Sequence, residues 1–352
     1  MHAPVPKHTS RVEPTIARPS VRSLVRACSA AAIALLERIP PHPATVVRRE
    51  WSSDDGAEWL LRAASEPTMM TTAPGLVQMW MVDFVASLTG QSAAASLFRE
   101  SLQLSFGRSG QINVPTLLGD PSLAAFVAEG YPIPVVQPLV QPLVTLTPYK
   151  LATIIVLTTE MVNSSNIEAL MYDALKRATS LALDRVLFDA NNADASRPRG
   201  LRYGISPSAA STAPDSTTAL LNDVETLHDS IEDVTPKDPV YIASPTRALM
   251  MELRSPHSLD PLKLYGSTAL HLTSDVIAIA APAVAVAYGD TPDISASRES
   301  ALQMDTAPVS ETLTGRTTST WQADLIAIKV RMPVSWALRS TIGCAWLTAT
   351  NW

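Results

Sequence analysis

Residues 146–189 read LTPYKLATIIVLTTEMVNSSNIEALMYDALKRATSLALDRVLFD. Residues 150–159 are rich in Thr, Ile, Val and Leu, which fit the pleated surface of a strand. Ser165 and Glu168 stand three apart, so their side chains can cap each other's backbone amides in a capping box. Apolar residues then recur at three- and four-residue steps, which predicts one amphipathic helix over residues 166–189. A strand followed by a long helix also occurs in enzymes, so this order leaves the function open.

Short motifs extend outward from this stretch in both directions. Leu-Thr-Pro-Tyr-Lys-Leu leads into the strand, Glu160 ends it, and Pro-Arg-Gly-Leu at residues 198–201 follows the helix. Upstream, residues 126–130 read Phe-Val-Ala-Glu-Gly, and downstream residues 321–348 close the chain with a pair of strand patterns. In this order the motifs, which cover roughly the last two thirds of the chain, resemble the major capsid proteins of tailed bacteriophages, the Hong Kong 97-like family.

The resemblance implies an α+β fold of the Hong Kong 97-like kind, with a long spine helix. Its divisions on this chain would be an amino-terminal arm and helices (1–110), an extended loop (111–146), a peripheral domain with the spine helix (147–205), an inserted axial domain (206–298) and the return strands of the peripheral domain (299–352).

The resemblance also implies where subunits meet. Interface candidates come from the loop and from the polar positions of the long helix: Asp120, Phe126, Glu129, Pro138, Pro142, Lys176, Arg177, Asp184 and Arg185. Some members of the family join subunits by an isopeptide bond between a loop Lys and an Asn of the peripheral domain. This chain has no Lys over residues 111–149 and no Asn over residues 301–320, so that cross-link is not expected.

Charge is distributed unevenly along the chain. The first 50 residues carry eight Lys or Arg and three Asp or Glu, which leaves 19 basic and 30 acidic residues for the remainder. A basic segment on an acidic body can face nucleic acid, although such a segment can equally be a solvated arm. On the first interpretation, the residues that face the interior of the shell and its DNA are Arg11, Arg18, Arg22 and Arg26.

Composition predicts a globular protein without a membrane span. Of the 352 residues, 46% are hydrophobic and 17% are charged. The cysteines are Cys28 and Cys344, which argues against a disulfide framework but leaves one bridge open. No apolar run approaches the roughly 20 residues of a membrane helix. The apolar residues 27–36 fit a helix in the arm better than a signal peptide, since they lie inside the chain and have no convincing cleavage site.

The segment before the quoted stretch is unusually rich in proline. Within residues 111–144, Gln-Pro-Leu-Val occurs twice in succession. Each proline removes a ladder donor, so the segment fits an exposed ribbon better than a central strand. Such a ribbon can lie across a neighbouring subunit. An ordinary hairpin packed inside one domain is the alternative.

The second half of the chain predicts a further unit after a Ser/Thr/Ala/Pro linker at residues 206–218. The patterns favour helices over residues 220–231 and 245–253 with a strand over 239–243 between them. Pro282 interrupts the apolar run 276–287, which is therefore better read as two short strands. Further helices are expected at 57–64 and 76–88, and closing strands at 322–331 and 335–348.

No catalytic or metal-binding pattern stands out. The six histidines show no metal-ligand spacing, and no phosphate-binding loop or nucleophile motif occurs. Glu225, Asp229 and Glu232 would share one helix face, which can bind a cation but is more often a solvated surface. We therefore expect no enzyme, no cofactor and no metal.

These observations favour a structural capsid protein that assembles into pentamers and hexamers of an icosahedral shell around double-stranded DNA, bound without sequence specificity. Portal, scaffold or decoration proteins are expected partners, with assembly in the host cytoplasm and a final place in the virion. One alternative is an encapsulin-like nanocompartment. Another, from a different class, is an α/β domain that binds or hydrolyses a small molecule.

Overall fold

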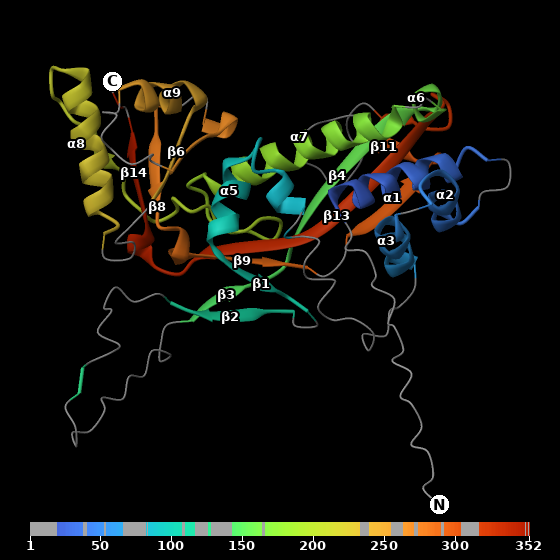
Figure 1. Cartoon of the computed structure of the whole chain (residues 1–352), viewed down its shortest axis with the longest axis horizontal. Coiled ribbons are helices and arrows are strands. Elements are labelled where there is room, and N and C mark those ends of the chain that lie inside the picture. The colour runs from blue at the N-terminus through green and yellow to red at the C-terminus, as the bar shows by residue number, and fades with distance from the viewer. Residues whose placement is uncertain are drawn as a thin grey trace, which may run out of the picture.

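The computed structural model describes residues 20–37, 41–52, 54–65, 82, 84–107, 110–116, 126–127, 143–163, 166–232, 239–254, 263–270, 274–289, 292–303, 317–348, 350 and 352. Helices and strands are mixed along these residues, and the strands form two five-stranded sheets and two two-stranded ribbons. The predicted α+β class is confirmed. The long diagonal strands and the helix above them connect a lobe with the second sheet to a lobe of short helices (Figure 1).

The first sheet is built around one long strand, β13 (Leu325–Leu338). Strand β4 (Tyr149–Thr158) pairs antiparallel with residues 325–334 of β13 on one edge. On the other edge, β10 (Asp293–Ser297) pairs with residues 327–331 and β9 (Val284–Tyr288) pairs with residues 334–338. Strand β1 (Leu102–Ser105) adds to β9 in parallel. Two closing strands are present, as predicted, but the break expected near residue 333 is wrong, because the first strand continues through Pro333 to Leu338 and the second begins only at Cys344.

The predicted long helix is confirmed as α7, Ile167–Leu187. Its 21 residues correspond to about 32 Å at 1.5 Å per residue. Asn166 is its N-cap and makes no side-chain capping bond, while the expected cap Ser165 lies outside the described residues. The strand before it ends two residues before Glu160, which lies instead in the short helix α6 (Thr159–Asn163).

Three helices near the start of the described chain form a compact unit: α1 (Val21–Ala34), α2 (Pro43–Glu50) and α3 (Asp55–Ser65). The sequence predicts α1 as part of an arm, but the structure places it in the core. Leu24, Ala27 and Cys28 are fully buried, and α1 packs against α2, α3, α7, β10 and β13. Small residues on several faces of α1 explain this, because they allow neighbours to approach it closely on all sides.

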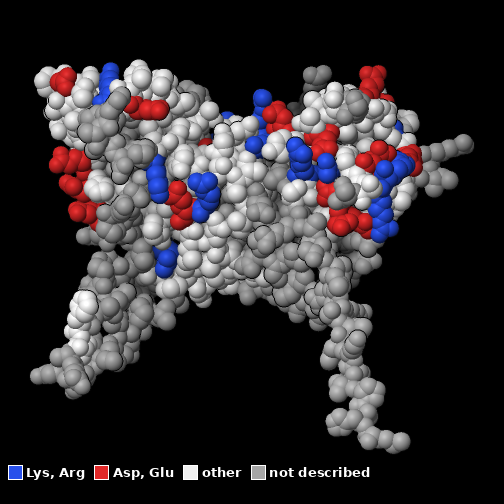
Figure 2. Space-filling view, in the orientation of Figure 1, with Lys and Arg blue, Asp and Glu red and all other residues white. Residues whose placement is uncertain are grey.

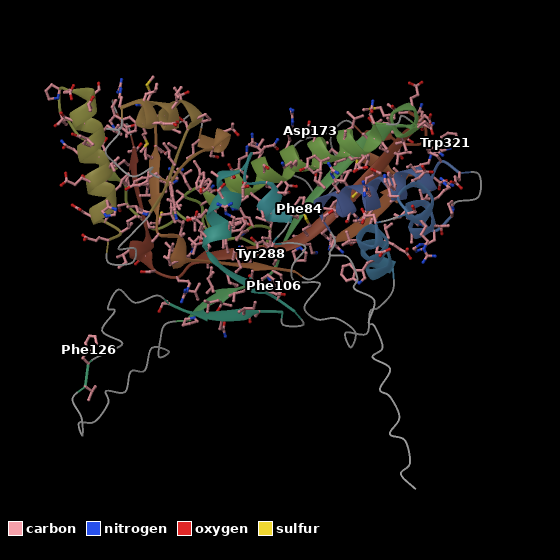
Figure 3. The ribbon with its side chains drawn as sticks, in the orientation of Figure 1. Phe84, Phe106, Phe126, Asp173, Tyr288 and Trp321 are labelled. Carbon is pink, nitrogen blue, oxygen red and sulfur yellow. The ribbon has the colours of Figure 1, made fainter. Side chains whose placement is uncertain are left out.

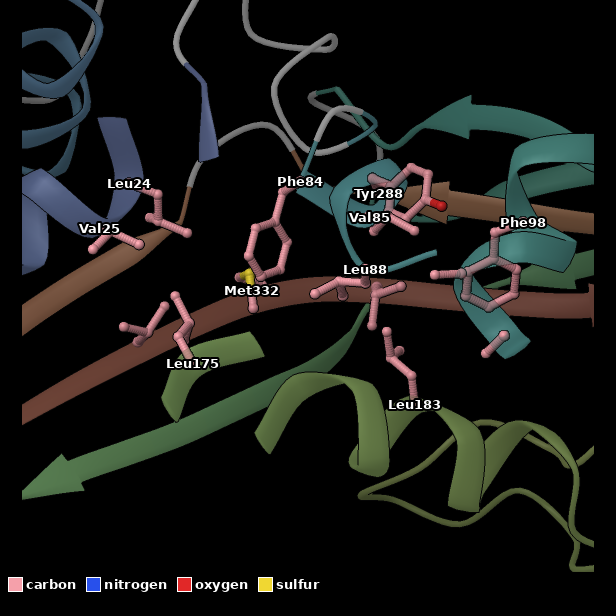
Figure 4. Close-up of a cluster of buried hydrophobic side chains, with 14 of the residues drawn as sticks. Leu24, Val25, Phe84, Val85, Leu88, Phe98, Leu175, Leu183, Tyr288 and Met332 are labelled. Carbon is pink, nitrogen blue, oxygen red and sulfur yellow. The ribbon is translucent and has the colours of Figure 1, made fainter. Parts of the chain in front are cut away.

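The core between α1, α7 and the first sheet continues through residues 84–100 (Figure 4). Leu24 and Val25 of α1 lie on one side of this cluster, and Leu175 and Leu183 come from α7. Helix α5 (Ala93–Glu100) adds Phe98, whose ring packs on Tyr288 and Trp336. Of the helix expected at residues 76–88, the part before residue 82 lies outside the described residues, and residues 84–87 are helical.

The second sheet has the order β5-β14-β8-β6-β7. Its strands are β5 (Ser208–Ala209), β14 (Cys344–Thr348), β8 (Val276–Ile279), β6 (Val240–Ala243) and β7 (Lys263–Gly266). The helices predicted at residues 220–231 and 245–253 are present as α8 (Ser216–Asp229) and α9 (Pro245–Arg254), and both pack on this sheet.

Proline 282 separates two strands, as predicted, but these strands belong to different sheets. Strand β8 lies in the second sheet and β9 in the first, with the 3-10 turn η2 (Ala281–Ala283) between them. The segment expected as an axial domain (206–298) thus contributes β9 and β10 to the first sheet, and the closing strand β14 pairs in the second. An axial domain inserted once would leave the first sheet and return to it once. Here the chain passes from β8 in the second sheet to β9, β10 and β13 in the first, and then returns to the second sheet with β14.

The remaining elements are short. They are the ribbon β2 (Ile112–Pro115) with β3 (Leu143–Leu146), the ribbon β11 (Ala301–Gln303) with β12 (Thr317–Ser319), and the 3-10 turns η1 (Thr268–Leu270) and η3 (Thr341–Gly343). Both cysteines are buried and free, so the bridge left open by the sequence is not formed. Burial raises the pKa of each thiol to about 12, which keeps both protonated at neutral pH.

Candidate assembly surfaces

The predicted loop begins from a described base, the β2–β3 ribbon. Val114 and Leu146 are buried against Phe106 and two alanines of β9, which attaches this base to the first sheet. Farther out, Phe126 is fully exposed and lies well away from the body (Figure 3). The remaining loop candidates lie outside the described residues: Asp120, Glu129, Pro138 and Pro142.

Helix α7 presents a polar outer side near its middle. Arg177 is exposed and pairs with Asp173 at 2.9 Å, one helical turn before it. The Lys176 amine lies 5.2 Å from the centre of the Tyr172 ring, a cation–π contact on a partly buried side chain. Arg185 is exposed near the end of the helix. These three basic residues remain candidates for contact with a second subunit.

Asp184 has a different place from the other helix candidates. Its side chain is 2% exposed, and its carboxylate accepts hydrogen bonds from the hydroxyls of Ser92 (2.6 Å) and Ser267 (2.5 Å). The backbone amides of Ala93 and Ala94 donate to it at 3.3 and 3.0 Å. Asp184 therefore joins α7 to the N-terminus of α5 and to the end of β7 within one chain, and it presents no surface to a neighbour.

A second buried contact lies just beyond the end of α7. The Arg202 guanidinium donates to the Phe188 carbonyl at 2.7 Å and pairs with Asp275 at 2.6 Å. It also stacks 4.7 Å from the centre of the Trp346 ring, on β14 of the second sheet. Together with Asp184, this residue attaches the end of α7 firmly to the second lobe. Neither contact was expected from the sequence, since no local pattern marks an Arg–Trp pair 144 positions apart.

Two of the four basic residues expected to face DNA lie in α1. Arg22 is exposed, whereas Arg26 is partly buried and bridges Asp54 at 2.9 Å and Glu168 at 3.2 Å. Arg26 therefore connects α1 to the start of α3 and to the start of α7. Arg11 and Arg18 lie outside the described residues.

The second lobe presents an acidic edge and an apolar stripe. Glu225, Asp229 and Glu232 are exposed, and acidic side chains gather over α8 at the left of Figure 2. The described residues contain no group of three or more side chains that could hold a metal ion. On α9, Leu249 and Leu253 are 52% and 68% exposed and stand one turn apart. This stripe was not singled out from the sequence, although its spacing is visible there.

A bend at the far end of β13 exposes Trp321, which is 77% accessible. Asp324, in the same turn, has a φ of 48°, which is uncommon for a residue with a side chain. The Arg298 guanidinium lies 3.2 Å from the Asp324 carboxylate, and a hollow of about 560 Å³ lies beside these residues. An exposed tryptophan of this kind is a common anchor in protein interfaces.

A larger groove, of about 650 Å³, lies where the ribbon base meets the body. Three segments enclose it: residues 144–149, residues 193–205 and residues 335–341. Arg199 and Arg339 are its charged lining residues, and no Asp or Glu lines it. No local sequence pattern marks this groove, because its walls come from three distant parts of the chain.

Within the described residues, no helix combines the length and apolarity that crossing a bilayer requires.

Comparisons with known proteins agree with the resemblance that the motifs indicated. No family model matches the chain. A capsid polyprotein of Pseudomonas phage PAJU2 is 28% identical over 234 residues, covering 59% of this chain and 34% of that protein. The chain thus spans about a third of the length of this curated relative. The predicted similarity to phage capsid proteins is confirmed.

Solved structures are similar at lower identity. A chain from Microbacterium phage Oxtober96 is 15% identical with a TM-score of 0.49, covering 74% of this chain and 90% of that one. A chain of a satellite phage P4 procapsid that includes the size determination protein is 9% identical with a TM-score of 0.48, covering 83% of this chain and 95% of that one. A chain of the holo-SrpI encapsulin complex of Synechococcus elongatus PCC 7942 is 12% identical with a TM-score of 0.43, covering 73% of this chain and 87% of that one.

Proposed function

We propose that this chain is a structural capsid protein that builds a phage shell by self-assembly. The observation that carries this proposal is the 28% identity over 234 residues to a phage capsid polyprotein. The motif order predicted the same role from the sequence and agrees with it. The match covers 34% of that polyprotein, so the proposed capsid role concerns this chain and not the other parts of the polyprotein.

The described surfaces fit assembly better than chemistry. Phe126 is fully exposed and lies well away from the body, and Trp321 and Leu253 are exposed on the body itself. The buried polar groups of Asp184 and Arg202 are occupied by partners within the chain. Large apolar side chains exposed at separate places are suited to repeated contacts between copies.

In this proposal, pentamers and hexamers form through the second lobe, and the loop of one subunit lies across the next. Each contact can be weak, because the contacts of one subunit act together once the first has formed. A heterologous contact that closes into a ring gives a finite particle instead of a filament. Portal, scaffold or decoration proteins would join this lattice. The shell would assemble in the host cytoplasm and be the wall of the virion.

The proposal also gives the basic amino-terminal segment a place inside the shell. Arg11, Arg18 and Arg22 would face packaged double-stranded DNA and contact its phosphates without reading sequence. Arg26 contributes less, because its charge is already shared with Asp54 and Glu168. Substituting Arg11, Arg18 and Arg22 with Gln should weaken retention of DNA and reduce the salt dependence of that retention.

Electron microscopy of the expressed full chain tests the proposed role. Closed shells of uniform diameter are expected in negative stain, together with elution in the void volume of a size-exclusion column. Elution of all the protein near its monomer mass of 37.7 kDa at high concentration would contradict the proposal. Particles that contain an enzyme instead of a genome would indicate an encapsulin-like compartment.

A further inference from the structure

Residues 349–352, the tail, follow β14 and end between α8 and α9, where the letter C stands in Figure 1. Of the tail, the structure describes Thr350 and Trp352, which are 2% and 5% exposed. The Thr350 hydroxyl donates to the Ser274 carbonyl at 2.8 Å, shortly before β8 begins. The described residues of the tail are therefore held inside the second lobe.

The indole of Trp352 is bound by both helices. Its Nε1 donates to the Asp223 carboxylate of α8 at 2.7 Å. The Arg247 guanidinium of α9 lies 5.4 Å from the ring centre in a cation–π contact, and it also donates to the Trp352 carbonyl. The ring belongs to the apolar core of the second lobe, together with Leu227 of α8 and Met251 of α9. The N–H group, the ring face and the apolar surface of the indole thus each have a partner.

The Asp223 side chain depends on this indole because it is buried. It is 2% exposed, and its carboxylate accepts from the Ser211 amide at 2.6 Å as well as from Trp352. The ion pairs of the described residues do not include Asp223. A buried carboxylate is costly when a hydrogen bond is missing. Both donors must therefore be in place for α8 to keep this side chain buried.

Helix α8 has few other directional contacts with its surroundings. Among the described residues, its side chains form hydrogen bonds outside the helix and its cap to Ser211 and Trp352. The rest of its attachment is apolar, through residues such as Leu220 and Leu227 on the second sheet. Apolar burial is non-directional, whereas a hydrogen bond restricts both distance and angle. Trp352 thus supplies directional contacts that connect α8 to α9.

We propose that α8 and α9 form an indole-binding site, and that the chain's own Trp352 occupies it as a strap that fixes the position of α8. Asp223 selects a ring with an N–H group, because a ring without one leaves a buried carboxylate oxygen unpaired. Arg247 selects an aromatic face. The strap thereby determines where Glu225 and Asp229, the exposed acidic side chains of α8, stand on the edge of the lobe. This inference goes beyond the proposed shell-forming function and does not depend on it.

Chemical rescue with free indole tests the proposal. Trp352→Gly empties the site and keeps the backbone of the tail, and amide hydrogen exchange of the full chain is followed by mass spectrometry. We expect exchange in α8 to become about tenfold faster while exchange in α7 stays unchanged, because α8 loses its attachment to α9. Millimolar indole should restore most of the protection, since a cavity of matched shape binds the missing group. Trp321→Gly, which removes an exposed tryptophan, is the control and should change neither α8 exchange nor its response to indole.

A second compound separates recognition of an indole from the filling of space. Benzothiophene has nearly the size of indole but no N–H group, so it should restore much less protection. Equal protection from the two compounds would overturn the role of Asp223, and unchanged α8 exchange in Trp352→Gly would overturn the strap.

Trp352→Phe keeps an aromatic ring and replaces Trp352→Gly if the latter does not fold. Exchange in α8 should then be several-fold faster than in the parent, because the N–H group is lost, and exchange equal to that of the parent contradicts the proposal. All variants are compared in the same state of assembly, so the result can be read whether or not shells form.

Discussion

The two ends of α7 are attached to the molecule by different kinds of contact. At the carboxyl end, Asp184 is buried and its carboxylate is surrounded by hydroxyl and amide donors without a cation. At the amino end, Arg26 joins Glu168 and Asp54 through ion pairs whose side chains are 9–30% exposed. The first attachment leaves no buried donor without a partner. The second gains energy from charges that water and salt partly screen.

This difference predicts that the second lobe is held rigidly to α7, while the unit of α1, α2 and α3 is held by packing with a smaller polar contribution. Buried polar contacts cost most when one partner is removed, because the other partners remain in the protein without water. Partly exposed pairs cost less, because water replaces the missing partner. The substitutions below test this contrast in the soluble chain.

Asp184→Ala should have the largest effect. It leaves two hydroxyls and two backbone amides without an acceptor in a buried site, so we expect a loss of about 4 kcal/mol in the free energy of unfolding. Urea unfolding followed by circular dichroism measures it. Asp173→Ala, on the exposed side of the same helix, is the matched control and should change little. Equal losses for the two variants would remove the contrast between buried and exposed positions.

Arg202→Ala should follow, with a loss of about 3 kcal/mol, because Asp275 is then left buried without its cation. A double-mutant cycle with Asp275→Asn separates the pair from the stacking on Trp346. We expect a positive coupling energy. Additive losses would show that the ion pair contributes nothing beyond its two members.

Arg26→Ala should cost less, about 1 kcal/mol, and the loss should shrink as salt is raised. Unfolding of the parent and the variant is compared at low and at high sodium chloride. A loss that does not depend on salt would mean that Arg26 acts through the packing of its aliphatic part. In that case the attachment at the amino end of α7 would not depend on screened ion pairs, and the contrast with the carboxyl end would be smaller.

The smallest effect concerns pH. Burial raises the pKa of Asp184 above its ordinary value, and the hydrogen bonds that it accepts oppose this only in part. Because the folded pKa lies above the unfolded one, the native state binds more protons between these two values, and stability falls as pH rises through that interval. Asp184→Asn should remove this slope. Unfolding free energies measured across mildly acidic pH would show parallel curves if Asp184 does not titrate in this way.

Much of the fold could be predicted because local patterns carry it. The apolar period of α7, the strand β4 before it and the break at Pro282 all depend on residues close in sequence. The sheet to which a strand belongs does not depend on such patterns. Strands β8 and β9 have the same apolar character, and only their distant partners place one in each sheet.

The candidate surfaces could be predicted less well. Phe126 was identified from a motif and is fully exposed. Asp184 was identified as a polar position on the helix, but its burial depends on Ser92 and Ser267, each more than 80 residues away. The groove beside β13 combines three segments that no local pattern connects.

The burial of α1 has a consequence for how the chain folds during synthesis. Helix α1 is synthesised long before β10 and β13, on which it packs, because these strands follow it by more than 250 positions. The apolar faces of α1 therefore stay partly uncovered until β10 and β13 have been synthesised. Contacts of such long sequence separation form slowly, and the exposed intermediate is prone to aggregation. A nascent chain of this protein should depend on chaperones until β13 has emerged.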